Sequence, residues 1–265
     1  MSLLRRIFRR EKPRSAANQA LVMVLLKDGE SFSGPAALDY LAAHWTDLPS
    51  VVGRDAQDAV AVASIPGGML GLMHVPMPVP AGDLEGPIAV AWHWPEAADV
   101  VPAHRAHVIV HAASTTLDAL DLRLLLTRLA ASALAVSDGV GVYVGDAMLL
   151  RSAADYLSDA AQASRDNLPI LSWVGFNPVR EDARLSAYTT GLTAFGLPEL
   201  EVRGSALTPP ELLGTLADIA TYELSTGKVL RDGDTFGASE TDRMRVRYRP
   251  SAFIPDVTVA GLELP

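Results

Sequence analysis

The segment TTGLTAFGLPELE, residues 189–201, gathers the residue types best suited to holding a small polar ligand or a partner's strand edge. Hydroxyls donate and accept hydrogen bonds, ionised carboxylates accept them, and glycine permits backbone angles that other residues avoid. The candidate binding residues are Thr189, Thr190, Gly191, Thr193, Gly196, Glu199 and Glu201. Paired carboxylates without a neighbouring base or metal specify no reaction, so we name no catalytic residue. The competing interpretation is a structural crossover in which Phe195 and Leu197 fill the core.

A second candidate is an alternation of arginine with other residues near the C-terminus. Arg243, Arg245, Arg247 and Arg249 would share one face of a strand over residues 244–249, because strand side chains alternate. Such a face suits an anion or an acidic partner, and Arg245 and Arg247 are the residues we expect to bind it. The alternative is an exposed face paired with nearby acids such as Glu240 and Asp242.

Three further motifs favour structural roles over chemistry. His107 and His111 would lie on one strand face at a spacing of about 13 Å, too far apart for one metal ion, and His104 lies before the strand. The glycines of GVGVYVG, residues 139–145, follow a long predicted helix and lie in a strand, which does not fit a dinucleotide loop. Residues 232–234 lack most ligands of a calcium loop. We therefore expect no metal site and no cofactor.

The start of the chain combines basic and apolar residues at helical spacing. Residues 1–14 hold six basic residues against one acid, a net charge of +5 in a chain of net charge −9. A helix over residues 2–11 would separate an apolar stripe from an arginine side, which is typical of reversible contact with an anionic membrane surface or of docking to a protein. The residues concerned are Leu3, Leu4, Arg5, Arg6, Ile7, Phe8, Arg9 and Arg10. A solvated tail is the alternative.

The composition limits the class of protein. The chain has 265 residues, 49% of them hydrophobic, and no cysteine, so disulfides, thiolate metal sites and cysteine nucleophiles are excluded. The acidic body disfavours nucleic acid as a partner. The apolar stretch Leu122–Val136 is interrupted by Arg123 and Arg128 and is too short to span a membrane. We expect a cytoplasmic protein, with contact at the inner membrane face as one role for the arm.

Hydrophobic periodicity predicts strands mixed with helices. The predicted strands are residues 20–26, 59–65, 69–75, 106–112, 139–144, 170–177, 184–190, 199–203 and 244–249. The predicted helices are residues 35–45, 88–94, 116–137, 153–163 and 209–225; capping boxes are expected at Thr115-x-x-Asp118, Ser152-x-x-Asp155 and Thr208-Pro-Pro-Glu211. This pattern predicts an α+β fold with a mixed, largely antiparallel sheet and helices on its faces. Residues 1–18 would form an arm and linker and residues 19–265 a single domain, with residues 19–76 as a β-α-β-β unit.

Several segments resemble a bacterial family known as domain of unknown function four-two-six-one. They are HRAHVIVHAA, LLLTRLAASALAVSDGVGVYVGDAML, LPILSWVGF, RLSAYTTGLTAFGLPELEV and GKVLRDGDTFGASETDRMRVRY. The resemblance covers roughly residues 90–250, and TTGLTAFGLPELEV is its most specific part. It implies a cytosolic α/β domain and assigns no activity and no catalytic residue.

Two function classes remain from the sequence. The absence of catalytic motifs and the amphipathic start favour a non-catalytic binding module that is tethered reversibly to a membrane surface or a partner. The alternative is an unrecognised hydrolase or transferase with a site around residues 188–201. A deep polar pocket around Glu199 would favour the enzyme, whereas a filled interior with an exposed apolar patch would favour the module.

Overall fold

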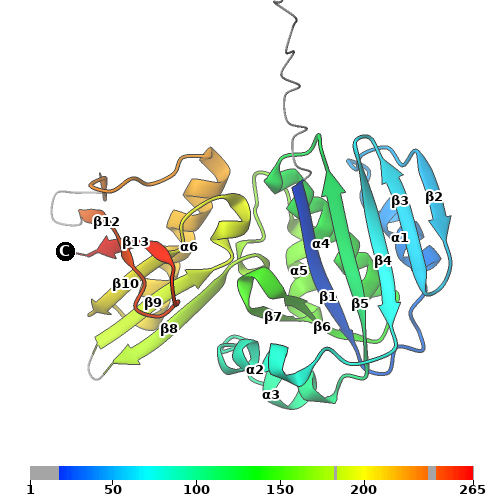
Figure 1. Ribbon diagram of the computed structural model, residues 1–265, viewed down its shortest axis with the longest axis horizontal. Helices are drawn as coiled ribbons and strands as arrows, with labels where there is room; N and C mark the ends of the chain where they lie inside the picture. Colours follow the sequence, from blue (N-terminus) through cyan, green and yellow to red (C-terminus); the bar gives the residue numbers. More distant parts are fainter. Residues whose placement is uncertain (1–17, 182–183, 238–242, 265) are drawn as a thin grey trace, which may run out of the picture.

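The strands form two separate sheets in the computed structural model, which describes residues 18–181, 184–237 and 243–264 (Figure 1). The first sheet has seven strands in the order β2-β3-β4-β5-β1-β6-β7, and the second has six in the order β11-β12-β13-β10-β9-β8. All neighbours are antiparallel except β10 and β13, which are parallel. The predicted α+β class and largely antiparallel pairing are confirmed, with the strands divided between two sheets.

The seven-stranded sheet is built around the apolar strand β1. Its strands are β1 (Asn18–Leu26), β2 (Gly53–Ala56), β3 (Val60–Ile65), β4 (Gly68–Val75), β5 (Ala106–Ser114), β6 (Gly139–Val144) and β7 (Leu149–Ser152). Along β1, Val22, Val24 and Leu26 enter the main core, whereas Leu25 enters a smaller cluster on the opposite side. This division follows from the alternation of side chains along a strand.

Helices cover one face of this sheet and only part of the other. The helices α1 (Gly34–His44), α4 (Ala119–Ala135) and α5 (Ala153–Gln162) lie behind the sheet in Figure 1. On the other face, α2 (Ala81–Ala89) and α3 (Ala97–Val100) cover only the lower end, where their apolar residues pack with Leu25 and Leu150. The remainder of that face has no helix over it within the described residues.

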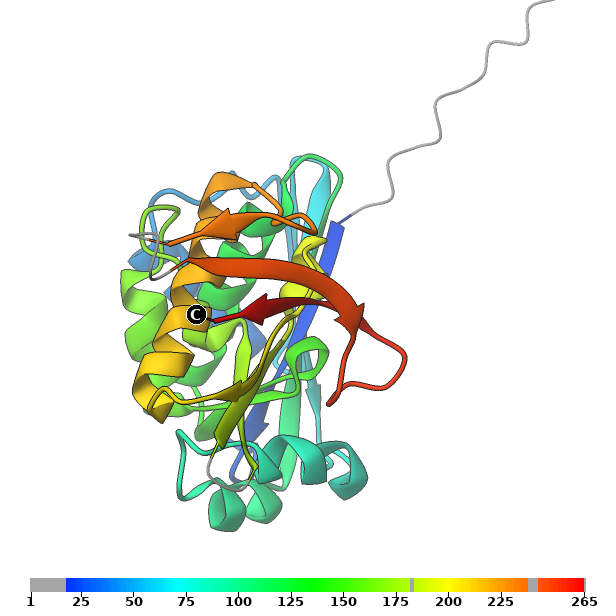
Figure 2. The ribbon, with the colours of Figure 1, turned by 90° about the vertical axis from the view of Figure 1, so that its left-hand side faces the viewer.

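The second sheet packs on a single long helix, and Figure 2 views the molecule from the side of this sheet. Its strands are β8 (Gly175–Glu181), β9 (Arg184–Thr190), β10 (Leu200–Ser205), β11 (Thr235–Phe236), β12 (Met244–Pro250) and β13 (Thr258–Glu263). The helix α6 (Pro209–Thr226) buries Leu212, Leu216 and Ala220 against it. Local sequence sets both ends of this helix. Thr208 and Glu211 form a capping box at its start, and Gly227, with left-handed backbone angles, ends it.

The two halves are joined through α4, which is buried on several sides. The Trp173 indole donates to the Thr127 hydroxyl at 2.8 Å, and Arg123 on α4 pairs with Asp146 and lies 5.5 Å from the centre of the Phe195 ring. Arg123 is 3% exposed, so this arginine, which interrupts the apolar stretch, contacts both halves from within the fold. Within the part of the chain that is described, no helix has both the length and the apolar character needed to cross a membrane.

Three local predictions need correction. The helix expected over residues 88–94 is instead α2 (Ala81–Ala89), which begins directly after Pro80, whose ring fixes φ at −53°. The cap of α4 is Asp118, which accepts from the Asp121 backbone N–H, whereas the Thr115 hydroxyl donates to the Gly67 carbonyl. Residues 170–172 form a 3-10 turn before β8, because Gly175 begins the paired segment.

Candidate functional site

The predicted site around residues 189–201 lies at the junction of the two halves, and its centre is the Glu199 carboxylate. Glu199 is 3% exposed and accepts three hydrogen bonds, from the Thr189 hydroxyl at 2.7 Å and from the backbone N–H groups of Gly191 at 2.9 Å and Thr193 at 3.1 Å. The structure thus brings together four of the predicted site residues. The carboxylate binds the 3-10 turn Leu192–Phe195 to the start of β10.

The hydroxyl groups of this segment are also engaged with the protein itself. The Thr189 hydroxyl accepts from the Leu200 backbone N–H at 2.8 Å, and the Thr190 hydroxyl donates to the Ala147 carbonyl at 2.6 Å. Asn177 donates to Thr190 at 3.2 Å. These contacts fit the competing interpretation from the sequence, a structural crossover. Leu197 is buried, and Phe195 packs against the hydrophobic core between the six-stranded sheet and α6.

The two predicted glycines differ in what surrounds them. Gly191 has φ of +106°, and a Cβ atom there would lie 2.7 Å from the Trp173 carbonyl oxygen, so glycine is required for both angle and space. Gly196 has φ of +74° with no neighbouring atom within 4 Å of such a Cβ, so only its backbone angle favours glycine.

Glu201 is the centre of a separate polar cluster on the other side of the crossover. Its carboxylate is fully buried and accepts from the Arg203 Nε at 2.5 Å, the Ser251 hydroxyl at 2.6 Å and the Ala252 backbone N–H at 3.0 Å. Burial alone would raise the pKa of Glu201, but the hydrogen bonds from Ser251, Arg203 and Ala252 outweigh it and lower the pKa below its ordinary value. Glu201 is therefore an ionised anchor for the segment after β12.

The predicted arginine face exists on β12, and its members have different surroundings. Arg245 is exposed and opposite Glu263 of β13, while Arg247 lies 3.9 Å from Asp232. Arg249 lies nearer the centre of the sheet, with Nε 3.6 Å from Glu201. The proposed acidic partners Glu240 and Asp242 lie outside the described residues, as do residues 2–11 of the arm.

The three histidines all have partners or positions that the strand pattern explains. His107 and His111 lie on one face of β5, opposite Leu25 and Leu21 of β1. The His104 Nε2 accepts from the Val79 backbone N–H at 2.8 Å, and the His107 Nδ1 lies 2.8 Å from the Met77 carbonyl oxygen. Burial lowers the pKa of His107 despite that contact, which favours a neutral ring. Among the described residues, no three His, Asp or Glu side chains are grouped to hold a metal ion.

A feature that the sequence did not reveal is an uncovered apolar sheet face, here called the open face. The strand register places Tyr143, Met23, Ile109, Met73 and Val60 side by side across five strands. The neighbouring rows add Leu21, Val62, Met69, His111 and Ala113. The exposed fractions of its outermost members are 47% for Val60, 44% for Met73, 41% for Met69 and 40% for Leu21. A face of this kind is typical of a binding surface.

The sequence did contain a signal for the open face. β1, β4 and β5 are apolar at both alternating sets of positions, whereas a strand with one solvated face normally alternates apolar and polar residues. What the sequence left undetermined is which of the two sets the helices cover.

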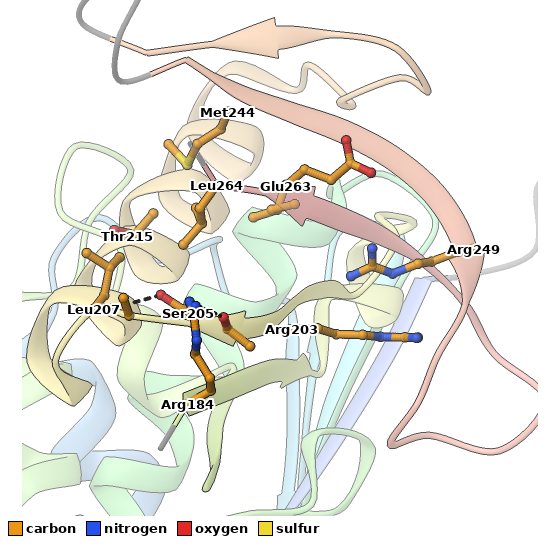
Figure 3. Close-up of a pocket in the computed structure, with 12 residues that line it drawn as sticks. Arg184, Arg203, Ser205, Leu207, Thr215, Met244, Arg249, Glu263 and Leu264 are labelled. Carbon is orange, nitrogen blue, oxygen red and sulfur yellow. Dashed lines mark hydrogen bonds between the residues drawn. The ribbon is translucent and has the colours of Figure 1, made fainter. Parts of the chain in front are cut away.

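A second feature missed from the sequence is a groove of about 530 Å³ on the six-stranded sheet, here called the arginine groove. Figure 3 shows Arg203 and Arg249 on one side of it and Leu207 and Thr215 on the other. Its lining is Arg184, Arg203, Gly204, Ser205, Ala206, Leu207, Thr215, Met244, Arg249, Leu262, Glu263 and Leu264. Of the arginine face predicted from the sequence, Arg249 lines this groove, whereas Arg245 and Arg247, the two residues expected to bind an anion, do not.

The family comparison covers the region in which the predicted site and most of the second sheet lie. Residues 188–262 match the model of a family described as a domain of unknown function (DUF4261). No curated protein and no solved structure matches the chain. The segments quoted before residue 184, including HRAHVIVHAA, lie outside the matched range. The resemblance expected from the sequence is therefore confirmed over residues 188–262, which match the uncharacterised domain DUF4261.

Proposed function

We propose that this protein is a non-catalytic binding module that recognises another protein through the open face. The observation that supports this proposal is the apolar row Tyr143–Met23–Ile109–Met73–Val60, which crosses five strands. Met73 and Val60 at one end of the row are exposed, whereas Met23 and Tyr143 at the other end pack against the small cluster of α2 and α3. A sheet face in contact with water is normally polar, and contiguous exposed apolar surface favours association. A protein partner of matching apolar shape would remove this surface from water.

The carboxylates that could have supported catalysis are hydrogen-bonded within the fold, which favours a binding role. The carboxylates of Glu199 and Glu201 accept hydrogen bonds from backbone and side-chain groups of the fold itself. A general acid or base must instead reach a substrate proton. Both carboxylates are at most 3% exposed.

The N-terminal arm adds a second contact in this proposal. Its net charge of +5 within residues 1–14 and its apolar residues at helical spacing suit reversible contact with an anionic membrane surface. The arm enters β1 at Asn18, three residues before Leu21 of the open face. We propose a cytoplasmic protein that presents its open face to a partner while the arm contacts the inner face of the membrane.

Site-specific photocrosslinking in the native cell tests the open face. A photoreactive phenylalanine analogue is placed at Met73, and the matched control carries it at Tyr222, an exposed aromatic residue of α6 with a 45% exposed fraction. We expect a discrete crosslinked product from position 73 that is absent from position 222. The product should also be lost when Val60→Lys is added and retained when Glu85→Lys is added. A product at twice the mass of the chain would show that the partner is a second copy of this chain. The absence of any product from position 73 would contradict the proposal.

A further inference from the structure

The arginine groove exists because two parallel strands separate. β10 and β13 are paired over Leu200–Val202 and Ala260–Leu262, and the ladder between them ends there within the described residues. β10 continues to Ser205 paired with β9 alone, after a register shift at Gly204, where φ is +59°. β13 continues to Glu263 paired with β12 alone. The groove therefore lies where the pairing of β10 with β13 has ended, and residues of both strands line it (Figure 3). A strand edge that has lost its neighbour can pair with another strand.

The charge of the groove is opposite in sign to that of the whole protein. Arg184, Arg203 and Arg249 line it together with one acid, Glu263, in a chain of net charge −9. Arg203 and Arg249 share the buried Glu201 carboxylate, while Arg184 donates to the Gly204 carbonyl at 3.1 Å. A guanidinium carries five N–H donors, so these contacts leave donors for an incoming carboxylate.

Arg249 has an incompletely satisfied guanidinium. Its Nε is buried and makes no hydrogen bond within the described residues, because the nearest Glu201 oxygen is 3.6 Å away. The Arg249 side chain as a whole is 25% exposed, so the rest of the guanidinium remains accessible from the groove. Buried donors normally have a hydrogen-bond partner. A carboxylate bound in the groove would give the accessible part of the Arg249 guanidinium an anionic partner.

Apolar side chains complete the lining. Leu207, Met244, Leu262 and Leu264 lie around the arginines, and Figure 3 shows Met244 and Leu264 on the side of the groove away from Arg184. Side chains of an extended peptide alternate between two directions, so one set would contact these apolar residues and the other the arginines. A small inorganic anion would use neither the strand edges nor the apolar residues.

We propose that the arginine groove binds an extended acidic peptide, which adds a short strand beside β10 or β13 and places its Asp or Glu side chains on Arg184 and Arg249. Peptides that join an exposed strand edge gain affinity from main-chain hydrogen bonds and specificity from side-chain pockets. This surface lies on the other sheet from the open face, so the proposal stands independently of the function proposed above.

Fluorescence anisotropy with designed peptides tests this proposal on the full chain. The probe is a labelled, end-blocked Val-Glu-Val-Asp-Val-Glu peptide, and the control probe has Lys at every acidic position. We expect saturable binding of the acidic probe that weakens at least tenfold in Arg249→Gln and at least threefold in Arg184→Gln. Arg105→Gln, which changes an exposed arginine outside the groove, should bind as the wild type does. Circular dichroism confirms that each variant is folded.

A third probe separates strand addition from charge attraction alone. In this probe every second backbone N–H carries a methyl group, so one edge of the peptide cannot donate hydrogen bonds. We expect its affinity to fall at least tenfold, and we expect the acidic probe to shift the amide NMR signals of residues 203–205 and 263–264. Equal binding of the methylated probe would overturn strand addition. Equal binding of the lysine probe, or of the acidic probe to Arg249→Gln, would overturn the assignment of the site.

Discussion

The Glu201 carboxylate is fully buried and accepts a hydrogen bond at 2.5 Å from the Nε of Arg203, which lies two residues later in the same strand, β10. The same carboxylate accepts from the Ser251 hydroxyl, which lies fifty residues later in the chain. One ionised group therefore connects β10 with the segment between β12 and β13. This relationship makes Glu201 an element of stability that also positions one wall of the arginine groove.

Replacing Glu201 with glutamine should destabilise the fold by about 3 kcal/mol at neutral pH, because an arginine and two other donors lose a buried anion. The folded state lowers the pKa of Glu201 below the ordinary 4.5, so its contribution is fully present above that pH and is lost as the pH falls through the lowered value. Urea unfolding at pH 7 and at pH 3 measures this difference. Glu85→Gln, at an exposed position of α2, is the matched control. A Glu201→Gln variant as stable as the wild type at pH 7 would contradict the anchor role.

Replacing Glu223 with glutamine should have the opposite effect. Burial raises the pKa of this α6 carboxyl above 4.5, although the Leu230 backbone N–H donates to Oε1 at 2.7 Å, and Oε2 has no partner within the described residues. The carboxyl therefore supports the fold best below pH 4.5, and that contribution is lost as the pH rises through the raised value. Glutamine keeps the acceptor without the charge, so we expect a gain of about 1 kcal/mol at pH 7. Chemical denaturation between pH 4 and 8 checks this; an unchanged pH profile in the variant would exclude it.

Two leucines of β1 should respond very differently to truncation. Leu26→Ala should cost about 2–5 kcal/mol, because Leu26 is fully buried in the main core. Leu21→Ala should cost less than about 1 kcal/mol, because Leu21 is 40% exposed on the open face. The free energy of unfolding of both variants measures the contrast. Similar losses in the two variants would mean that the open face is covered by the protein itself.

The two glycines of the crossover provide a second contrast. Gly191→Ala should destabilise the fold by about 3 kcal/mol, because alanine would meet both an unfavourable φ of +106° and the Trp173 carbonyl oxygen 2.7 Å away. Gly196→Ala should cost only about 1 kcal/mol, since its φ of +74° is the sole obstacle. Thermal unfolding of the two variants checks the order, and the reverse order would disprove this account of the crossover.

Flotation with anionic vesicles tests the proposed role of the arm. Full-length protein should float with vesicles containing phosphatidylglycerol, and a chain of residues 15–265 should remain below. Each arginine near an anionic surface contributes roughly 1 kcal/mol, so the four in residues 5–10 account for a difference of about a thousandfold in partitioning. Raising the salt concentration should weaken the flotation. Equal flotation of both chains would remove the membrane contact from the proposal.

The sequence determined most of the local structure, because local structure depends on neighbouring residues. Thr208-Pro-Pro-Glu211 predicted the start of α6, and the apolar segment of residues 20–26 predicted β1 within two residues of its observed start. The strands that pair as the hairpins of β3 with β4 and of β8 with β9 were also predicted from their apolar patterns. In each case the deciding interactions lie within a few residues along the chain.

Only the tertiary structure decided which polar groups are hydrogen-bonded within the fold and which apolar groups are buried in it. Glu199 and Glu201 suggested a ligand site in sequence, but their partners come from the crossover turn and from Ser251, which folding alone brings close. The apolar residues of β1, β4 and β5 did not reveal which side α1, α4 and α5 would cover, so the open face emerged only in three dimensions. The arginine groove depends on the separation of β10 from β13, two strands more than fifty residues apart that are set side by side by the sheet. Such long-range pairing leaves no periodic trace in the sequence, which is why the chain's chemistry at these surfaces became visible only with the fold.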